Sequence, residues 1–134
     1  MYSQKLQKYR KPLKLALIIA WFMTIITSLW FGLKPTPLSL NISPSEDKWM
    51  HLCAFVSMAF LPALIFANVR PFIGALVFVF MIGVSIEILQ GLMPTRSEQI
   101  TDIAANAGGI VIGALIGKIF ANICRSYLYK NESG

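Results

Sequence analysis

Residues 71–93 read PFIGALVFVFMIGVSIEILQGLM and contain a single charged side chain, Glu87. A helix rises about 1.5 Å per residue, so about 20 largely apolar residues cross the hydrocarbon core of a bilayer. The segment is therefore predicted to be a transmembrane helix. Three further segments meet the same criterion, namely residues 15–33, 49–69 and 103–124.

The composition of the whole chain is that of a membrane protein. Of its 134 residues, 56% are hydrophobic and only 13% are charged, and the mean hydropathy is +0.65. A soluble domain has about 25% charged residues, and two cysteines are too few for a disulfide scaffold. We therefore predict an all-α fold, a four-helix membrane domain within residues 15–124, flanked by tails at 1–14 and 125–134.

The distribution of Lys and Arg predicts how the helices are oriented. Four spans place both termini on one side of the membrane, and that side carries nine of the 12 basic residues. The positive-inside rule then places both tails in the cytoplasm. Because the net charge of +6 is explained by these flanks, we expect contact with the bilayer and no nucleic-acid binding.

The polar side chains of the spans gather toward one end of the predicted bundle, the extracytoplasmic end in this orientation. An ionisable group at the centre of a membrane costs about 2.5–3.5 kcal/mol and is by default a functional candidate. The residues concerned are Asp47, Lys48 and His51 at the start of the second span, Glu87 and Gln90 near the end of the third, Arg96 in the next loop, and Asp102 and Asn106 at the start of the fourth.

Four of these residues form the predicted catalytic set: Asp47, His51, Glu87 and Asp102. Asp47 and His51 are four residues apart on one helix face, where a carboxylate can orient an imidazole for acid–base chemistry. The alternative is that Asp47 only caps its helix beside an interfacial histidine. Glu87 has a structural alternative too, an interhelical hydrogen bond that fixes packing.

The other four are predicted to bind a substrate: Lys48, Gln90, Arg96 and Asn106. A guanidinium at headgroup level can hold a phosphate bidentately, although Arg96 can equally pair with a neighbouring carboxylate. His51 with its neighbouring carboxylates is a conceivable ligand set for a divalent ion. The chain has no HExxH motif and no Cys/His cluster, so we predict no metal and no cofactor.

Three glycines of the fourth span, Gly109, Gly113 and Gly117, repeat at four-residue intervals. Small residues with this spacing form a ridge on which another helix backbone can approach closely. The ridge is therefore predicted to pack the fourth helix against the second or the third.

The order, spacing and topology of these residues resemble the VanZ-like family of small membrane proteins. The resemblance runs from Asp47 to Gly113, and the chain departs from it at Phe55, where the family often has tyrosine. The departure puts any chemistry that depends on that hydroxyl in doubt. The matching blocks are Asp47-Lys48-x-x-His51, Glu87-x-x-Gln90-x-x-x-Pro94-x-Arg96, and Asp102-x-x-x-Asn106-x-x-Gly109-x-x-x-Gly113.

The resemblance implies a multi-pass protein of the bacterial plasma (inner) membrane with a role in the cell envelope. The family takes its name from a protein associated with resistance to the glycopeptide teicoplanin. Together with the polar end of the bundle, this leads us to expect binding or processing of a phosphate-bearing, lipid-linked envelope intermediate at the outer leaflet. The alternative is a non-catalytic envelope scaffold whose polar residues are structural or dock a partner. Neither the residues nor the resemblance sets an oligomeric state.

Overall fold

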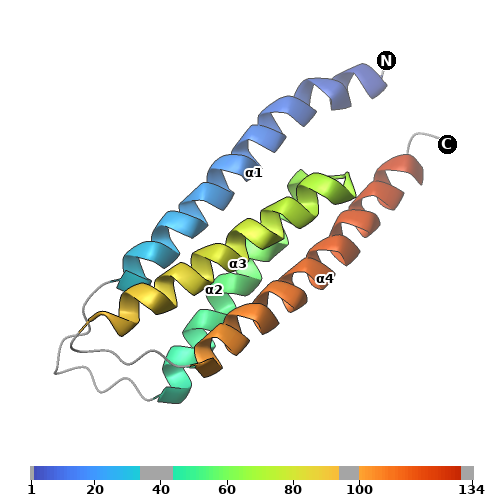
Figure 1. Cartoon of the computed structure of the whole chain (residues 1–134). Helices are drawn as coiled ribbons and strands as arrows, with labels where there is room; N and C mark the ends of the chain where they lie inside the picture. The colour runs from blue at the N-terminus through green and yellow to red at the C-terminus, as the bar shows by residue number, and fades with distance from the viewer. Residues whose placement is uncertain (1, 34–43, 94–99, 131–134) are drawn as a thin grey trace.

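The computed structural model describes residues 2–33, 44–93 and 100–130, and this part of the chain forms four α-helices and no strand (Figure 1). The side chains of residues 2–10, 44, 45, 47 and 128–130 lie outside the description. Each helix is long and apolar enough to cross a membrane, which confirms the predicted all-α, four-span class. The helices are α1 (Tyr2–Leu33), α2 (Pro44–Ile65), α3 (Val69–Gly91) and α4 (Ile100–Lys130).

The helices differ from the predicted spans at their ends. The first and last run beyond the apolar segments, since α1 begins at Tyr2 and α4 continues to Lys130. Hydropathy marks only the part of a helix inside the hydrocarbon, whereas backbone hydrogen bonding continues into the basic flanks. The second helix ends at Ile65, earlier than predicted, because Asn68 is extended (φ −78°, ψ 142°) and starts the next helix.

The closest packing in the bundle is between α2 and α4. A Cβ atom added to Gly109 would lie 2.6 Å from the Leu52 carbonyl oxygen, and one on Gly117 would lie 2.8 Å from that of Phe60. Gly113, between them, lies against the α2 backbone in the same way. The glycine ridge therefore brings two helix backbones into direct contact, and its partner is α2.

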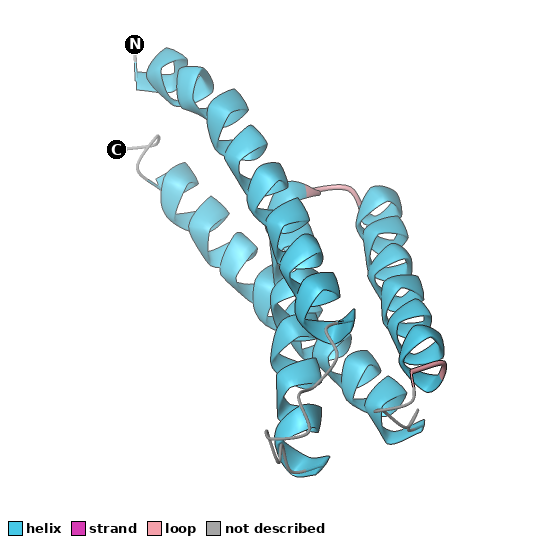
Figure 2. Ribbon diagram, turned by 90° about the vertical axis from the view of Figure 1, so that its left-hand side faces the viewer, coloured by secondary structure: helices cyan, strands magenta, loops and turns pink. Residues whose placement is uncertain are grey.

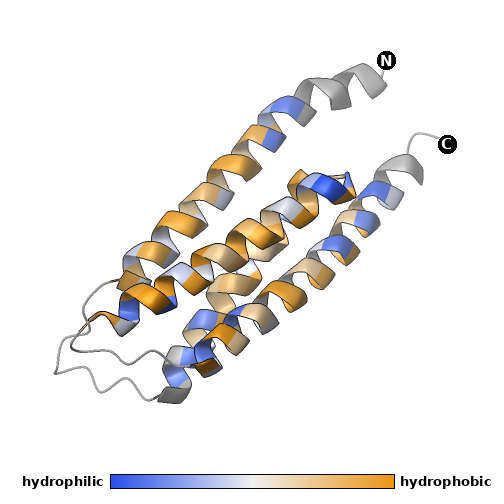
Figure 3. Cartoon of the chain, viewed as in Figure 1, coloured by the Kyte–Doolittle hydropathy of each residue, from blue (hydrophilic) through white to orange (hydrophobic). Residues whose placement is uncertain are grey.

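The first helix packs on α2 and, less extensively, on α3, and in the described part of the chain its backbone does not come close to that of α4. Figure 2 shows α1 running along the bundle beside these helices. Two interhelical hydrogen bonds hold it: the indole Nε1 of Trp21 donates to the Met58 carbonyl at 2.9 Å, and Nε2 of Gln90 donates to the Gly32 carbonyl at 2.7 Å. The outward faces of all four helices are largely hydrophobic (Figure 3). Such a surface is suited to lipid rather than to water.

The helix ends that carry the predicted polar residues lie together at one end of the bundle. The N-terminal end of α1 and the C-terminal end of α4 lie at the same end of the molecule (Figure 1). The start of α2, the end of α3 and the start of α4 lie at the opposite end. An even number of membrane-length helices produces this arrangement, and it brings the predicted polar residues of three helices to one level. Which end faces the cytoplasm stays a prediction.

Candidate functional site

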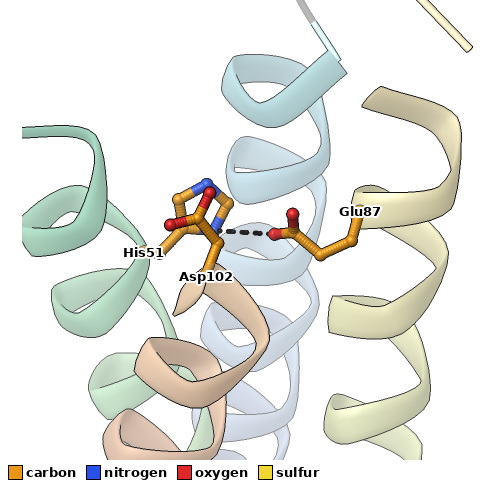
Figure 4. Close-up of side chains that lie close together, drawn as sticks. All are labelled: His51, Glu87 and Asp102. Atoms are coloured by element: carbon orange, nitrogen blue, oxygen red, sulfur yellow. Dashed lines mark ion pairs between the residues drawn. The ribbon is translucent and has the colours of Figure 1, made fainter. Parts of the chain in front are cut away.

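Four polar side chains from three helices meet inside the bundle and form what we call the polar cluster: His51, Glu87, Asp102 and Asn106. They are 8%, 2%, 4% and 1% exposed, respectively. His51 lies near the start of α2, Glu87 one turn before the end of α3, and the other two in the first turns of α4. Figure 4 shows the imidazole and both carboxylates turned toward one another.

Asn106 links the helices that carry the imidazole and the α3 carboxylate. Its Oδ1 lies 3.1 Å from Nδ1 of His51, and its Nδ2 donates to Oε1 of Glu87 at 3.4 Å. The same Glu87 oxygen lies 3.6 Å from His51 Nδ1. Nδ1 faces two oxygens that can accept a hydrogen bond, so the ring donates to them in the form that carries a hydrogen on Nδ1.

Asp102 closes the cluster on the α4 side. Its carboxylate oxygen, one oxygen of Glu87 and one ring nitrogen of His51 all lie within 4.8 Å of one another. Asp102 is the acidic residue in the first turn of α4, where the backbone N–H groups of a helix favour a negative charge. The helix that supplies the amide therefore also stabilises a carboxylate beside the ring.

A glycine that the sequence did not single out makes room for the cluster. A Cβ atom on Gly83 would lie 2.9 Å from the Phe55 ring and 3.2 Å from Nδ2 of Asn106. Phe55 is almost fully buried, at 1% exposure, so an apolar ring and the Asn106 amide both lie against Gly83. The signal available in the sequence was a glycine four residues before Glu87, inside an otherwise apolar helix.

The remaining predicted site residues are not all part of the cluster. Gln90 is buried, but its amide nitrogen is bonded to the end of α1. Lys48 is half-buried in the first turns of α2. The side chain of Asp47 and the whole of Arg96 lie outside the described residues. The catalytic role of Asp47 and the substrate-binding roles of Lys48, Gln90 and Arg96 therefore stay predictions.

A cavity of about 330 Å³ opens beside the cluster, between α1, α2 and α3. Most of its lining is apolar, including Phe31 of α1, Met50 of α2 and Ile86 of α3, and His51 is its basic lining residue. The sequence did not indicate this cavity, because hydropathy does not tell which helix faces which. The imidazole thus belongs both to the polar cluster and to an apolar space.

Four membrane-length helices around a buried group of two carboxylates, an imidazole and an amide define a small multi-pass membrane protein. The VanZ/LLP1 family matches residues 3–121, nearly the whole chain. The chain therefore belongs to this family, which confirms the resemblance seen in its polar residues and extends it beyond residues 47–113. No curated protein and no solved structure matches the chain.

Proposed function

We propose that the protein binds, and acts on, a lipid with a phosphate-bearing head group at the extracytoplasmic face of the bacterial plasma membrane. The observation that carries the proposal is the position of His51, which lines an apolar cavity and is hydrogen-bonded inside the polar cluster. An amphipathic ligand needs both environments at adjoining places. Part of its chain would occupy the cavity while its head group meets the cluster.

The chemistry of the cluster supports a head group that exchanges protons or donates hydrogen bonds. His51 supplies a nitrogen for acid–base work, and Glu87 together with Asn106 orients the ring. Two carboxylates repel a phosphate, so binding requires positive charge nearby. In this proposal Lys48 and Arg96 supply it from the loop side of the cluster, as their places in the sequence predict.

One observation favours a second function, that of a structural or partner-docking envelope protein. Asn106 spans the cluster from His51 to Glu87, and so ties α2, α3 and α4 together. Such a network specifies how three membrane helices pack, even when no ligand is bound. Under this alternative the cluster residues set folding and abundance rather than recognition.

Thermal unfolding of the purified protein in detergent micelles separates the two functions. The probes are polyprenyl phosphate, the polyprenol of the same chain length, and phosphatidylcholine. A ligand that binds only the folded state raises the unfolding temperature. We expect the phosphate-bearing lipid to raise it most, and phosphate release from the same mixture reports turnover. Equal effects of polyprenol and polyprenyl phosphate would contradict the proposal.

Two variants and a matched control assign the effect to the site. Ala54→Leu narrows the cavity and His51→Gln removes the imidazole, so both are expected to lose the lipid-dependent shift. Ala16→Leu adds the same side chain to an exposed position of α1 and is expected to retain it. If His51→Gln lowers only the basal stability and keeps the lipid shift, the structural alternative is favoured.

The proposal includes an orientation and an envelope phenotype. Reporter fusions at both ends are expected to be active only in the cytoplasm, which would place the cluster outside. Through the family, the proposal extends to teicoplanin: deletion of the protein and the His51→Gln variant are expected to change sensitivity in the same direction. Unchanged sensitivity with a normal lipid-precursor profile would separate this protein from a role in resistance.

A further inference from the structure

We infer that the polar cluster binds one divalent transition-metal ion, of the zinc or manganese type, through His51, Glu87 and Asp102. The inference goes beyond the proposed function, because it depends on the cluster alone and requires no lipid. One ligand atom from each of the three residues lies within 4.8 Å of the other two. All three side chains are more than nine-tenths buried.

The spacing between the His51 and Glu87 ligand atoms is close to that of neighbours in a coordination shell. With bonds of about 2.1 Å, neighbouring ligand atoms lie about 3.4 Å apart in a tetrahedral site and about 3.0 Å apart in an octahedral one. Nδ1 of His51 lies 3.6 Å from Oε1 of Glu87 and 3.1 Å from Oδ1 of Asn106. The first distance is long for a hydrogen bond but fits two ligands of one ion.

The charges of the cluster also call for a divalent ion. Two carboxylates are held in the interior of a membrane bundle, where an uncompensated negative charge is costly. An imidazolium neutralises only one of them, whereas an ion of charge +2 neutralises both and leaves the ring neutral, as a metal ligand must be. The ion would also supply the positive charge that a phosphate head group needs.

The mixture of donor atoms points to the kind of metal. Mg²⁺ and Ca²⁺ prefer oxygen ligands throughout, whereas Zn²⁺ and Mn²⁺ accept an imidazole together with carboxylates. The sequence favoured no metal, since it lacks a local motif with two ligands on one helix. Here the three ligands come from α2, α3 and α4, so no spacing along the chain could signal the site.

Metal binding can be measured on the full-length protein in detergent, without lipid. The Cys53→Ser/Cys124→Ser variant serves as the background, since both thiols are exposed and a cysteine thiolate is in general a good zinc ligand. After removal of metal with a chelator, Zn²⁺ or Mn²⁺ is titrated and bound metal is counted per protein. We expect one saturable site and, with Mn²⁺, an electron spin-echo signal from a coordinated imidazole nitrogen.

Three variants that replace a ligand side chain by an amide, and one control, test the ligands. His51→Gln, Asp102→Asn and Glu87→Gln are each expected to weaken binding at least about tenfold. Glu46→Gln removes an exposed carboxylate from the same helix as His51 and should bind as the background does.

The measurements decide between a metal and a network of hydrogen bonds alone. Absence of a saturable site in the background protein would overturn the inference, as would a Mn²⁺ signal without nitrogen coupling. That spectrum is recorded on the background protein alone, so a ligand variant that fails to fold does not block the test. Because no lipid is present in this experiment, its outcome is independent of the lipid-binding test. The protein can bind lipid without binding metal, and it can bind metal without binding lipid.

Discussion

One added methyl group at Gly109 is predicted to separate α4 from α2. The new Cβ atom would lie 2.6 Å from the Leu52 carbonyl oxygen and 3.1 Å from the Val56 nitrogen. Favourable contacts begin at about 3.5 Å, so the two backbones must part by about 1 Å. Overpacking of this kind lowers the free energy of unfolding by about 1–3 kcal/mol. The better helix propensity of alanine offsets up to about 1 kcal/mol of this loss.

The same displacement reaches the polar cluster. Asn106 lies one turn before Gly109 on α4, and its Oδ1 is 3.1 Å from Nδ1 of His51. A shift of about 1 Å lengthens this contact to about 4 Å, which no longer is a hydrogen bond. Gly109→Ala is therefore expected to lower the free energy of unfolding and to weaken metal and lipid binding together.

The control is the neighbouring glycine on the same helix. A Cβ atom on Gly108 would meet only the Leu52 Cδ1 atom, at 3.7 Å, which is an ordinary contact. Gly108→Ala should therefore leave the stability unchanged or raise it by up to about 1 kcal/mol. The assay is unfolding of both variants in mixed micelles, followed by helical circular dichroism. Equal stabilities for Gly108→Ala and Gly109→Ala would refute the close backbone contact.

Three further substitutions test other contacts by the same unfolding assay. Asn106→Leu removes an amide that serves two buried partners and is expected to cost about 1–3 kcal/mol; a neutral result would contradict its bridging role. Gln90→Leu removes the hydrogen bond to the Gly32 carbonyl and is expected to lower the free energy of unfolding by about 0.5–1.5 kcal/mol. Because that bond holds the end of α1, the variant should also increase cross-linking of α1 to added lipid probes. Lys118→Met removes the 3.2 Å bond to the Phe66 carbonyl and should destabilise the protein; unchanged unfolding would show that this bond contributes nothing.

The number and class of the helices could be predicted because each span is a long run without charge, and length alone identifies it. The gathering of polar residues at one end was equally visible, since groups so costly in a membrane stand out against their neighbours. Four of these polar residues come together in the structure, namely His51, Glu87, Asp102 and Asn106.

What the sequence could not supply is the rotation of each helix about its axis. The glycine repeat marked a packing face of α4 without naming α2 as its partner. Gln90 lies three residues after Glu87, a spacing that places both on one helix face, yet its amide nitrogen donates to a carbonyl of α1. The cavity and the space left by Gly83 arise only when three helices are placed together. Each depends on contacts between residues far apart in the chain.

The backbone contact between α2 and α4 divides the polar cluster into a stiff half and a compliant half. The imidazole, the amide and the Asp102 carboxylate are anchored on these two helices, whose mutual distance is limited by main-chain atoms. Glu87 comes from α3, which touches both helices far less extensively. Any change in the size of what the cluster holds must then be absorbed by α3. Protein engineers who wish to retune the cluster should begin with the side chains around Glu87 and leave the glycine ridge intact.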